Sequence, residues 1–311
     1  MLHKTKTIHK ILILILMFIT IIVFIVLRND PVSSSKQKPL IIAHHAGGGQ
    51  WPGNTIYAIQ KAQENGIKII NVTTVLSKDK VPVLFHGFKL SSTTDGKGSP
   101  ENFTVKQLQA LDAGYQFNKN GKYIYRNKGI RIPTLKQTLN SINQDTKIII
   151  DIKTPKYKAL IDALQNTLEP KDWAKAIFYS TDGKALQYLK TLYPNATVFL
   201  DRETTRKILL NYKIQNSDII QNIKTASLNW IAFENTRTMD ICEKFTLGTS
   251  CTSEIFKNLW TKNIIQDIHK YNPKAKIIMI NANTIQDYKY ATSLQMYGVY
   301  TNYPLQMTAG E

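Results

Sequence analysis

The feature that most constrains the fold is a regular alternation of apolar, strand-like runs with helix-like segments from residue 39 onward. Many of these runs are apolar throughout, as parallel strands are when helices cover one face and side chains pack inside the other. About eight βα units in about 280 residues predict a TIM (β/α)8 barrel. An open doubly wound sheet is the alternative, but no dinucleotide-binding fingerprint in the sequence supports it.

The individual elements follow from the same alternation. Strands are predicted at Leu40–His44, Lys68–Leu76, Val81–His86, Lys147–Lys153, Ala176–Ser180, Thr197–Asp201, Asn229–Phe233, Lys276–Asn281 and Gly298–Thr301. Helices are predicted at Asn54–Asn65, Leu135–Ile142, Tyr157–Leu168, Lys184–Leu192, Glu254–Lys270 and Thr284–Ser293. Residues 87–133 interrupt the pattern with a polar turn and a short helix near Val105–Leu111, and the polar stretch 204–227 is not assigned to an element.

The N-terminus carries an almost entirely apolar run at residues 11–27, which three lysines precede. Its length is at the short end of what a membrane-spanning helix needs. The positive-inside rule then predicts a single-pass anchor with its N-terminus in the cytoplasm and the body of the protein outside. A cleavable signal peptide is the alternative, although the run is long for one and no clear cleavage site follows. The predicted parts are a cytoplasmic segment 1–10, an anchor 11–28, a linker 29–38 and a barrel 39–311.

Charge and cysteine content narrow the choice of partners. The formal net charge of +18 indicates an anionic partner, and the absence of a nucleic-acid-binding motif argues against nucleic acid. Cys242 and Cys251 are the two cysteines. In an oxidising compartment they would close a disulfide loop, whereas two unpaired thiols remain the alternative, and their spacing is not that of a zinc site.

Polar side chains follow several of the predicted strands. His44, His45 and His86 come at strand ends, and Asp151 and Lys153 end another strand. Because a TIM barrel builds its active site at the carboxyl ends of its strands, we expect these five side chains to meet. A pair of histidines serves as general acid and base near neutral pH, which suits cleavage of a phosphodiester.

The stretch LIIAHHAGGGQWPGNT at residues 40–55 resembles the first motif of the glycerophosphodiester phosphodiesterase family, His-Arg-Gly followed by Pro-Glu-Asn-Thr. The resemblance extends over residues 39–306 and implies a TIM barrel with an insertion after the second strand, at 87–133. It places His44 and His86 on the two catalytic histidines of the family. It places Lys153, in Asp151-Ile152-Lys153, on the substrate-binding lysine of the Glu-Ile-Lys motif. The segment Thr301-Asn302-Tyr303-Pro304 resembles the closing Thr-Asp-Tyr-Pro motif.

The chain departs from the family pattern mainly by lacking acidic side chains at the metal-binding positions. The family holds a divalent cation, Ca²⁺ or Mg²⁺, with carboxylates at positions where this chain has Gly53, Asn71 and Thr73. Asp151 is the one carboxylate left, and neutral side chains are weak ligands for such cations, so we expect a weakened metal site or none. His45 replaces the phosphate-contacting arginine and would partly substitute for it when protonated. A nitrogen-rich site for zinc, built from the three histidines, Asp151 and Glu234, is a further alternative.

Three functions are compatible with these observations. The first is an active phosphodiesterase with a reshaped site. The second is a pseudoenzyme that binds an anionic lipid headgroup, a glycerophosphodiester or an envelope polymer. The third is a structural envelope protein. The predicted partners are a phosphodiester or other anionic small molecule and, through the N-terminal run, a membrane.

Overall fold

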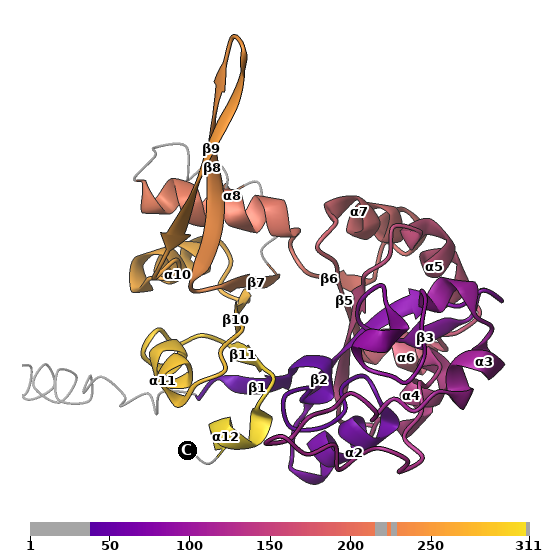
Figure 1. Ribbon diagram of the computed structural model, residues 1–311. Coiled ribbons are helices and arrows are strands. Elements are labelled where there is room, and N and C mark those ends of the chain that lie inside the picture. The colour runs from indigo at the N-terminus through magenta and orange to yellow at the C-terminus, as the bar shows by residue number, and fades with distance from the viewer. Residues whose placement is uncertain (1–37, 215–222, 225–228, 309–311) are drawn as a thin grey trace, which may run out of the picture. The chain divides into compact units, whose positions relative to one another are not determined.

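The computed structural model describes residues 38–214, 223–224 and 229–308, in which eight parallel strands form a nearly closed barrel. The first and last strands pair with each other, which brings the two ends of the domain together (Figure 1). The strand order is β6-β5-β4-β2-β1-β11-β10-β7, and the amide of Leu200 donates to the carbonyl of Trp230 at 2.7 Å to join the two ends. The predicted TIM-type barrel is therefore confirmed. The strands are β1 (Leu40–Ala43), β2 (Ile69–Leu76), β4 (Lys147–Ile152), β5 (Ala176–Tyr179), β6 (Thr197–Val198), β7 (Trp230–Glu234), β10 (Lys276–Ile280) and β11 (Gly298–Thr301).

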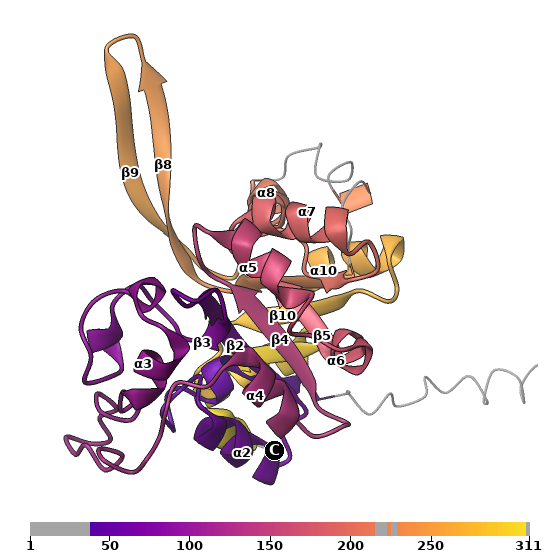
Figure 2. The same ribbon diagram turned by 90° about the vertical axis from the view of Figure 1, so that its right-hand side faces the viewer.

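Helices cover the outside of the barrel because each presents one apolar face to the strands. Figure 2 shows α4 to α7 along the outer side of β4 and β5. Several helices begin at a capping side chain: Thr55 caps α2 after the glycine-rich loop, and Asp201 caps α8 shortly after β6. The two caps fix the residues at which the chain leaves the carboxyl end of the barrel and enters a helix. The helices are α2 (Ile56–Glu64), α4 (Leu135–Ser141), α5 (Tyr157–Leu164), α6 (Pro170–Lys175), α7 (Gly183–Leu192), α8 (Arg202–Lys213), α10 (Lys262–Tyr271), α11 (Ile285–Ser293) and α12 (Pro304–Thr308).

The interior of the barrel is a packed apolar core. Ile42, Ile69 and Ile149 point inward with the larger rings of Phe199 and Trp230. All five are buried, so the barrel is filled and has no pore. A ligand therefore cannot enter the interior of the barrel and has to bind at its carboxyl end, where the side chains are polar.

The insertion after β2 forms a small layer with its own core. It begins with β3 (Pro82–Leu84), which pairs antiparallel with β2, and continues through η2 (Leu90–Ser92), η3 (Pro100–Asn102) and α3 (Val105–Ala110). Leu90, Leu108 and Ile132 are almost fully buried in this core together with Val83 of β3. The insertion is thereby packed on the barrel beside the end of β2.

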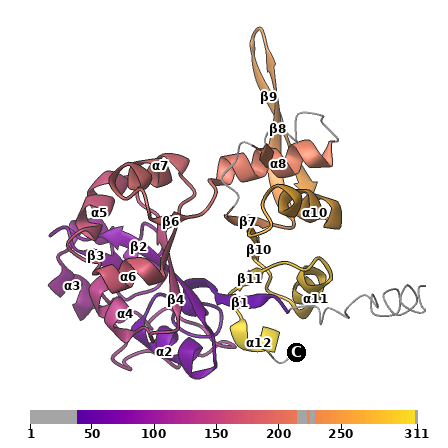
Figure 3. The same ribbon diagram turned by 180° about the vertical axis from the view of Figure 1, so that it is seen from behind.

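The sequence did not predict the hairpin of β8 (Arg237–Phe245) and β9 (Gly248–Phe256). It projects away from the barrel (Figure 3), and most of its side chains are exposed. Cys242 and Cys251 face each other across the two strands and form a disulfide, so this alternative for the two cysteines is confirmed. The helix predicted at Glu254–Lys270 begins only at Lys262, because β9 occupies its first residues.

The predicted membrane anchor, residues 11–28, lies outside the described residues, as does nearly all of the predicted linker. Among the helices that the structure does describe, none has the length and apolar character required to cross a membrane.

Candidate functional site

The five predicted site residues come together at the carboxyl end of the barrel. His44 and His45 follow β1 in the short helix η1 (His44–Ala46), where His45 has a positive φ of 50°. His86 follows β3, Asp151 lies near the end of β4, and Lys153 is the residue after that strand. Strand ends that are far apart in the sequence thus supply one site, as the sequence predicted.

The three histidines form a row. The ring centroids of His44 and His45 are 3.8 Å apart, and those of His45 and His86 are 4.2 Å apart. Nδ1 of His44 donates to Oδ1 of Asn302 at 3.0 Å, and Nδ1 of His86 lies 3.3 Å from Oγ1 of Thr73. Each outer ring is therefore oriented through Nδ1, which leaves Nε2 for contact with a ligand.

Burial keeps all three histidines neutral near pH 7. Loss of solvent and, to a smaller extent, the positive charge of Lys153 together lower the pKa of His44 and of His86 to about 4. Burial, followed by the neighbouring histidines, lowers the pKa of His45 well below its usual range. A neutral His45 does not supply the positive charge of an arginine, so the role expected for its protonated form finds no support in these surroundings.

Asp151 is an almost completely buried carboxyl group. Burial raises its pKa to about 6, although the positive charges of Lys153 and Arg202 act in the opposite direction. Its Oδ1 atom has no hydrogen-bond partner among the described residues, and neither does the buried hydroxyl of Tyr300. Buried polar atoms are nearly always paired in proteins, so these two atoms indicate where a ligand would bind.

The residues at the family's metal positions do not fit a hard divalent cation. Oδ1 of Asn71 accepts from the amide of His45 at 3.2 Å, and the hydroxyl of Thr73 contacts His86. A Cβ atom at Gly53 would lie 3.0 Å from the carbonyl oxygen of His45, so a side chain at this position would require the loop to shift. Asp151 is thus a single carboxylate, whereas Ca²⁺ and Mg²⁺ need several oxygen ligands.

The nitrogen-rich zinc site is not formed either. Within the described residues no group of three or more His, Cys, Asp or Glu side chains is placed to hold a metal ion. Glu234, the fifth member of the predicted set, instead pairs with Arg202 and Arg237. The described side chains therefore do not fit a zinc ion at this site.

Two pockets open at this end of the barrel. The first, which we call the barrel pocket, has a volume of about 290 Å³ and is lined by charged or ionisable groups, among them His44, Asp151, Lys153, Arg202, Glu234 and Arg237. The second, the insertion pocket, has a volume of about 390 Å³ and is lined by His45, His86, the glycine-rich loop and residues of the insertion. No Asp, Glu, Lys or Arg is among the described residues that line the insertion pocket.

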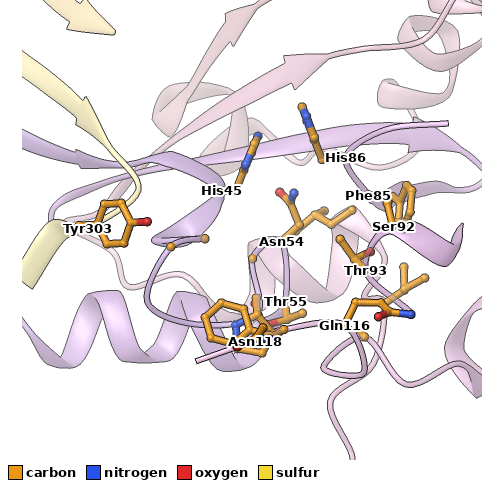
Figure 4. A pocket seen from close by; sticks show the side chains of 18 residues that line it. His45, Asn54, Thr55, Phe85, His86, Ser92, Thr93, Gln116, Asn118 and Tyr303 are labelled. Carbon is orange, nitrogen blue, oxygen red and sulfur yellow. The ribbon is translucent and has the colours of Figure 1, made fainter. Parts of the chain in front are cut away.

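Figure 4 shows the insertion pocket at close range. His45 and His86 lie beside each other near Asn54, Gln116 lies on the side of the insertion, and Tyr303 lies on the opposite side. Oδ1 of Asn54 accepts from the amide of Thr73 at 2.8 Å, which fixes the orientation of its amide. The polar groups of this pocket are thus uncharged amides and hydroxyls that can bind an alcohol or a polyol.

Sequence reasoning missed the arginines of the barrel pocket. Arg202 is the first residue of α8 and follows the capping residue Asp201, which lies just beyond the short strand β6. Arg237 begins β8. The available signal for Arg202 was Asp201, a capping residue at the end of the predicted strand Thr197–Asp201, since it places the next side chain at the barrel end.

Known proteins with similar sequences and folds identify the family of this chain. The model of the glycerophosphoryl diester phosphodiesterase family matches residues 44–305. The chain belongs to this family. An uncharacterized protein of Mycobacterium tuberculosis, Rv2277c, is 30% identical over 270 residues, which cover 86% of this chain and 88% of that protein.

Solved structures of this family have the same fold. The crystal structure of the glycerophosphoryl diester phosphodiesterase domain of Rv2277c has a TM-score of 0.74 at 27% identity, and it covers 88% of this chain and 98% of its own. A phosphodiesterase from Oleispira antarctica, in complex with its product sn-glycerol-3-phosphate, has a TM-score of 0.65 at 20% identity. It covers 88% of this chain and 96% of its own, and at that identity it supports the fold alone.

Proposed function

We propose that this family member cleaves phosphodiesters that contain a glycerophosphoryl group, with His44 and His86 as the acid–base pair and Lys153 as a phosphate-binding residue. The observation that carries the proposal is the histidine row. Both outer rings are held through Nδ1, and Lys153 lies at the same end of the barrel. The Oleispira antarctica phosphodiesterase of the same fold binds sn-glycerol-3-phosphate, which suggests the product class.

The proposed reaction needs two proton transfers. Nε2 of one histidine takes the proton of the attacking oxygen, from water or from a hydroxyl group of the substrate, as that oxygen bonds to phosphorus. The second histidine, in its protonated form, gives its proton to the leaving alkoxide as the phosphorus–oxygen bond breaks. Lys153 stabilises the negative charge that develops on the non-bridging oxygens.

The lowered histidine pKa values set the pH dependence of this reaction. One ring has to be protonated and the other neutral, and both pKa values in the free protein are about 4. Because kcat/KM reports the pKa values of the free enzyme, kcat/KM should rise as the pH falls from 7 toward about 5.

A second candidate function is binding of the same phosphodiesters without turnover. It is favoured by the neutral residues at three of the family's metal-ligand positions and by the low pKa values of both outer histidines. A bound metal ion contributes several kcal/mol of transition-state stabilisation in enzymes that use one. A site without that contribution still binds its ligand.

The two candidates separate in one experiment. The full chain, purified in detergent with EDTA, is assayed for hydrolysis of bis(p-nitrophenyl) phosphate and of glycerophosphocholine, beside His44→Asn and His86→Asn. Hydrolysis that both variants lose supports the enzyme. Binding of sn-glycerol 3-phosphate without any hydrolysis between pH 4.5 and 8 supports the binding protein, and absence of both rejects the proposal.

We also propose that residues 11–28 anchor the protein in a membrane, with residues 1–10 in the cytoplasm and the barrel outside it. The apolar run with its preceding lysines supports this orientation, and the disulfide Cys242–Cys251 is expected in an oxidising compartment. The barrel is then periplasmic or extracellular, so external protease should digest it in spheroplasts, from which any outer barrier has been removed. A barrel protected until the spheroplasts are lysed would contradict the orientation.

A further inference from the structure

The barrel pocket contains an arginine for which the proposed reaction gives no role. Arg202 donates from Nη1 to the hydroxyl of Tyr179 at 3.0 Å, and its Nη2 lies 2.5 Å from both carboxylate oxygens of Glu234. Nη1 of Arg237 donates to the same carboxylate at 2.9 Å. The side chains of Arg202 and Glu234 are only 14% and 16% exposed, so this pair is shielded from solvent.

The charges of this pocket do not cancel. Two guanidinium groups share the single carboxylate of Glu234, which leaves one net positive charge, and Lys153 adds a second on the same pocket. Above its pKa of about 6 the carboxylate of Asp151 offsets one of the two, so one net positive charge remains at neutral pH. Arg202 and Lys153 both act on the carboxyl group of Asp151, which shows that these groups share one electrostatic environment. An anion that enters the barrel pocket is therefore attracted.

Two unpartnered polar atoms point to a ligand at the same place. Oδ1 of Asp151 and the hydroxyl of Tyr300 are buried, lack a hydrogen-bond partner among the described residues, and belong to side chains that line the barrel pocket. A phosphate oxygen would accept from the Tyr300 hydroxyl, and a hydroxyl of the ligand would donate to Asp151. Neither atom is used by the pairing of Arg202 with Glu234.

We propose that Arg202 binds the phosphate group of the substrate in the barrel pocket, and that Glu234 weakens this binding because it competes for the same guanidinium. The inference rests on the proposed function of this site. Arg202 then supplies, from the start of α8, the guanidinium that position 45 lacks. Phosphate and carboxylate both fit the planar fork of arginine, so one can replace the other on Arg202.

This assignment also accounts for the lost carboxylates. Ca²⁺ and Mg²⁺ need several oxygen ligands, carboxylates among them, whereas a guanidinium group is attached to the chain and needs none. With neutral residues at positions 53, 71 and 73, Arg202 and Lys153 give the phosphate site a positive charge that does not depend on a metal ion.

The test measures the dissociation constant of sn-glycerol 3-phosphate by titration calorimetry, with the full chain in detergent and EDTA. Arg202→Gln should raise the dissociation constant at least about tenfold, as loss of a charge-assisted, bidentate contact does. Glu234→Gln should lower it by roughly threefold to tenfold, because the competing negative charge is removed. Arg202→Lys keeps the charge without the fork, so its value should lie between those of the wild type and Arg202→Gln.

Glu203→Gln is the matched control. Glu203 is the next residue of the same helix and pairs with Lys207 on the exposed surface, so its substitution removes the same charge outside the pocket. Its dissociation constant should stay within about twofold of the wild type, because exposed ion pairs contribute little. Thermal unfolding of each variant separates a weaker site from a weaker fold.

The inference requires that Arg202→Gln raise the dissociation constant and that Glu234→Gln lower it. If Arg202 only ties α8 to β7, Glu234→Gln lowers the melting temperature and does not tighten binding, which overturns the inference. If Lys153→Met weakens binding while the Arg202 and Glu234 variants match the wild type, the inference fails and the proposed function stands. Binding only after addition of Ca²⁺ or Mg²⁺ also overturns it, and no binding under either condition rejects the proposed function as well.

Discussion

The two pockets at the barrel end differ in charge and in the part of the chain that builds them. The barrel pocket takes Lys153, Arg202 and Glu234 from strand ends and the loops directly after them. The insertion pocket takes uncharged groups such as Asn54 and Gln116 from the glycine-rich loop and the insertion. His44 lines the first pocket, and His45 and His86 line the second. The difference suggests how a diester lies: its anionic phosphate at the barrel and an uncharged alcohol against the insertion.

The largest effect should come from the histidine row between the pockets. His86→Asn keeps a polar side chain but removes a proton-transfer group, so kcat should fall about 10²-fold to 10⁴-fold. The measurement is hydrolysis of glycerophosphocholine. His269→Asn is the control, since His269 lies on α10 and its Nε2 contacts the carbonyl oxygen of Ala275. Equal loss in the two variants would show that the effect is not specific to the row.

The buried carboxyl group of the barrel pocket should lower stability at neutral pH. The folded protein raises the pKa of Asp151 from 3.8 to about 6, so its stability contribution is complete below pH 3.8 and is lost as the pH rises through 6. Asp151→Asn should therefore raise the free energy of unfolding by up to about 3 kcal/mol above pH 6 and change it little near pH 4. Urea unfolding at pH 4 and pH 7.5 measures this difference.

The histidines act in the opposite direction, so the comparison has to be made between variant and wild type. Their pKa values are lowered on folding, and their contribution is present above pH 6.5 and is lost as the pH falls toward 4. The wild type and Asp151→Asn both contain these histidines, so their contribution cancels in the difference between the two free energies of unfolding. The control is Asp145→Asn, because Asp145 is exposed and pairs with Lys68. A stability gain for Asp145→Asn equal to that of Asp151→Asn would contradict the burial argument.

A smaller effect should follow from placing a charge in the insertion pocket. Gln116→Glu adds a carboxylate to an uncharged lining, which should lower the KM for glycerophosphocholine by about twofold to fivefold, since choline is cationic. The KM for glycerophosphoglycerol, whose second alcohol is neutral, should not fall. Gln60→Glu on the exposed side of α2 carries the same charge change outside the pocket. If Gln60→Glu has the same effect, net charge explains the result and the pocket does not.

The smallest effect should come from divalent cations. Because Asp151 is the one carboxylate at the family's metal positions, EDTA, Ca²⁺ and Mg²⁺ should change the rate of hydrolysis by less than about twofold. The rates are compared after dialysis against EDTA and after return of each cation. A rate that falls to background in EDTA and recovers with one cation would show that the barrel pocket binds a metal after all.

The barrel itself was predictable from the sequence because its strands are continuous apolar runs. The predicted run Gly298–Thr301 matches β11 residue for residue, and the run Lys147–Lys153 ends one residue beyond β4. The β8–β9 hairpin was not predicted because most of its side chains are exposed and its strands carry no apolar periodicity, as Ile241 and Ile255 at exposed positions illustrate. An apolar periodicity arises in the sequence where a strand or helix buries one face, so an element whose side chains are mostly exposed has little periodicity from which it could be predicted.

For the site, the sequence by itself determined which strand ends carry chemistry: His44, His86 and Lys153 follow apolar runs, and parallel strands bring their carboxyl ends to one edge. Only the tertiary structure decided the charge state of those groups. Burial makes the histidines neutral, and the fold brings Arg202 and Glu234, which are 32 residues apart in the sequence, into one ion pair beside Asp151. Desolvation and the distance between charges depend on everything packed around a side chain, which no local stretch of sequence contains.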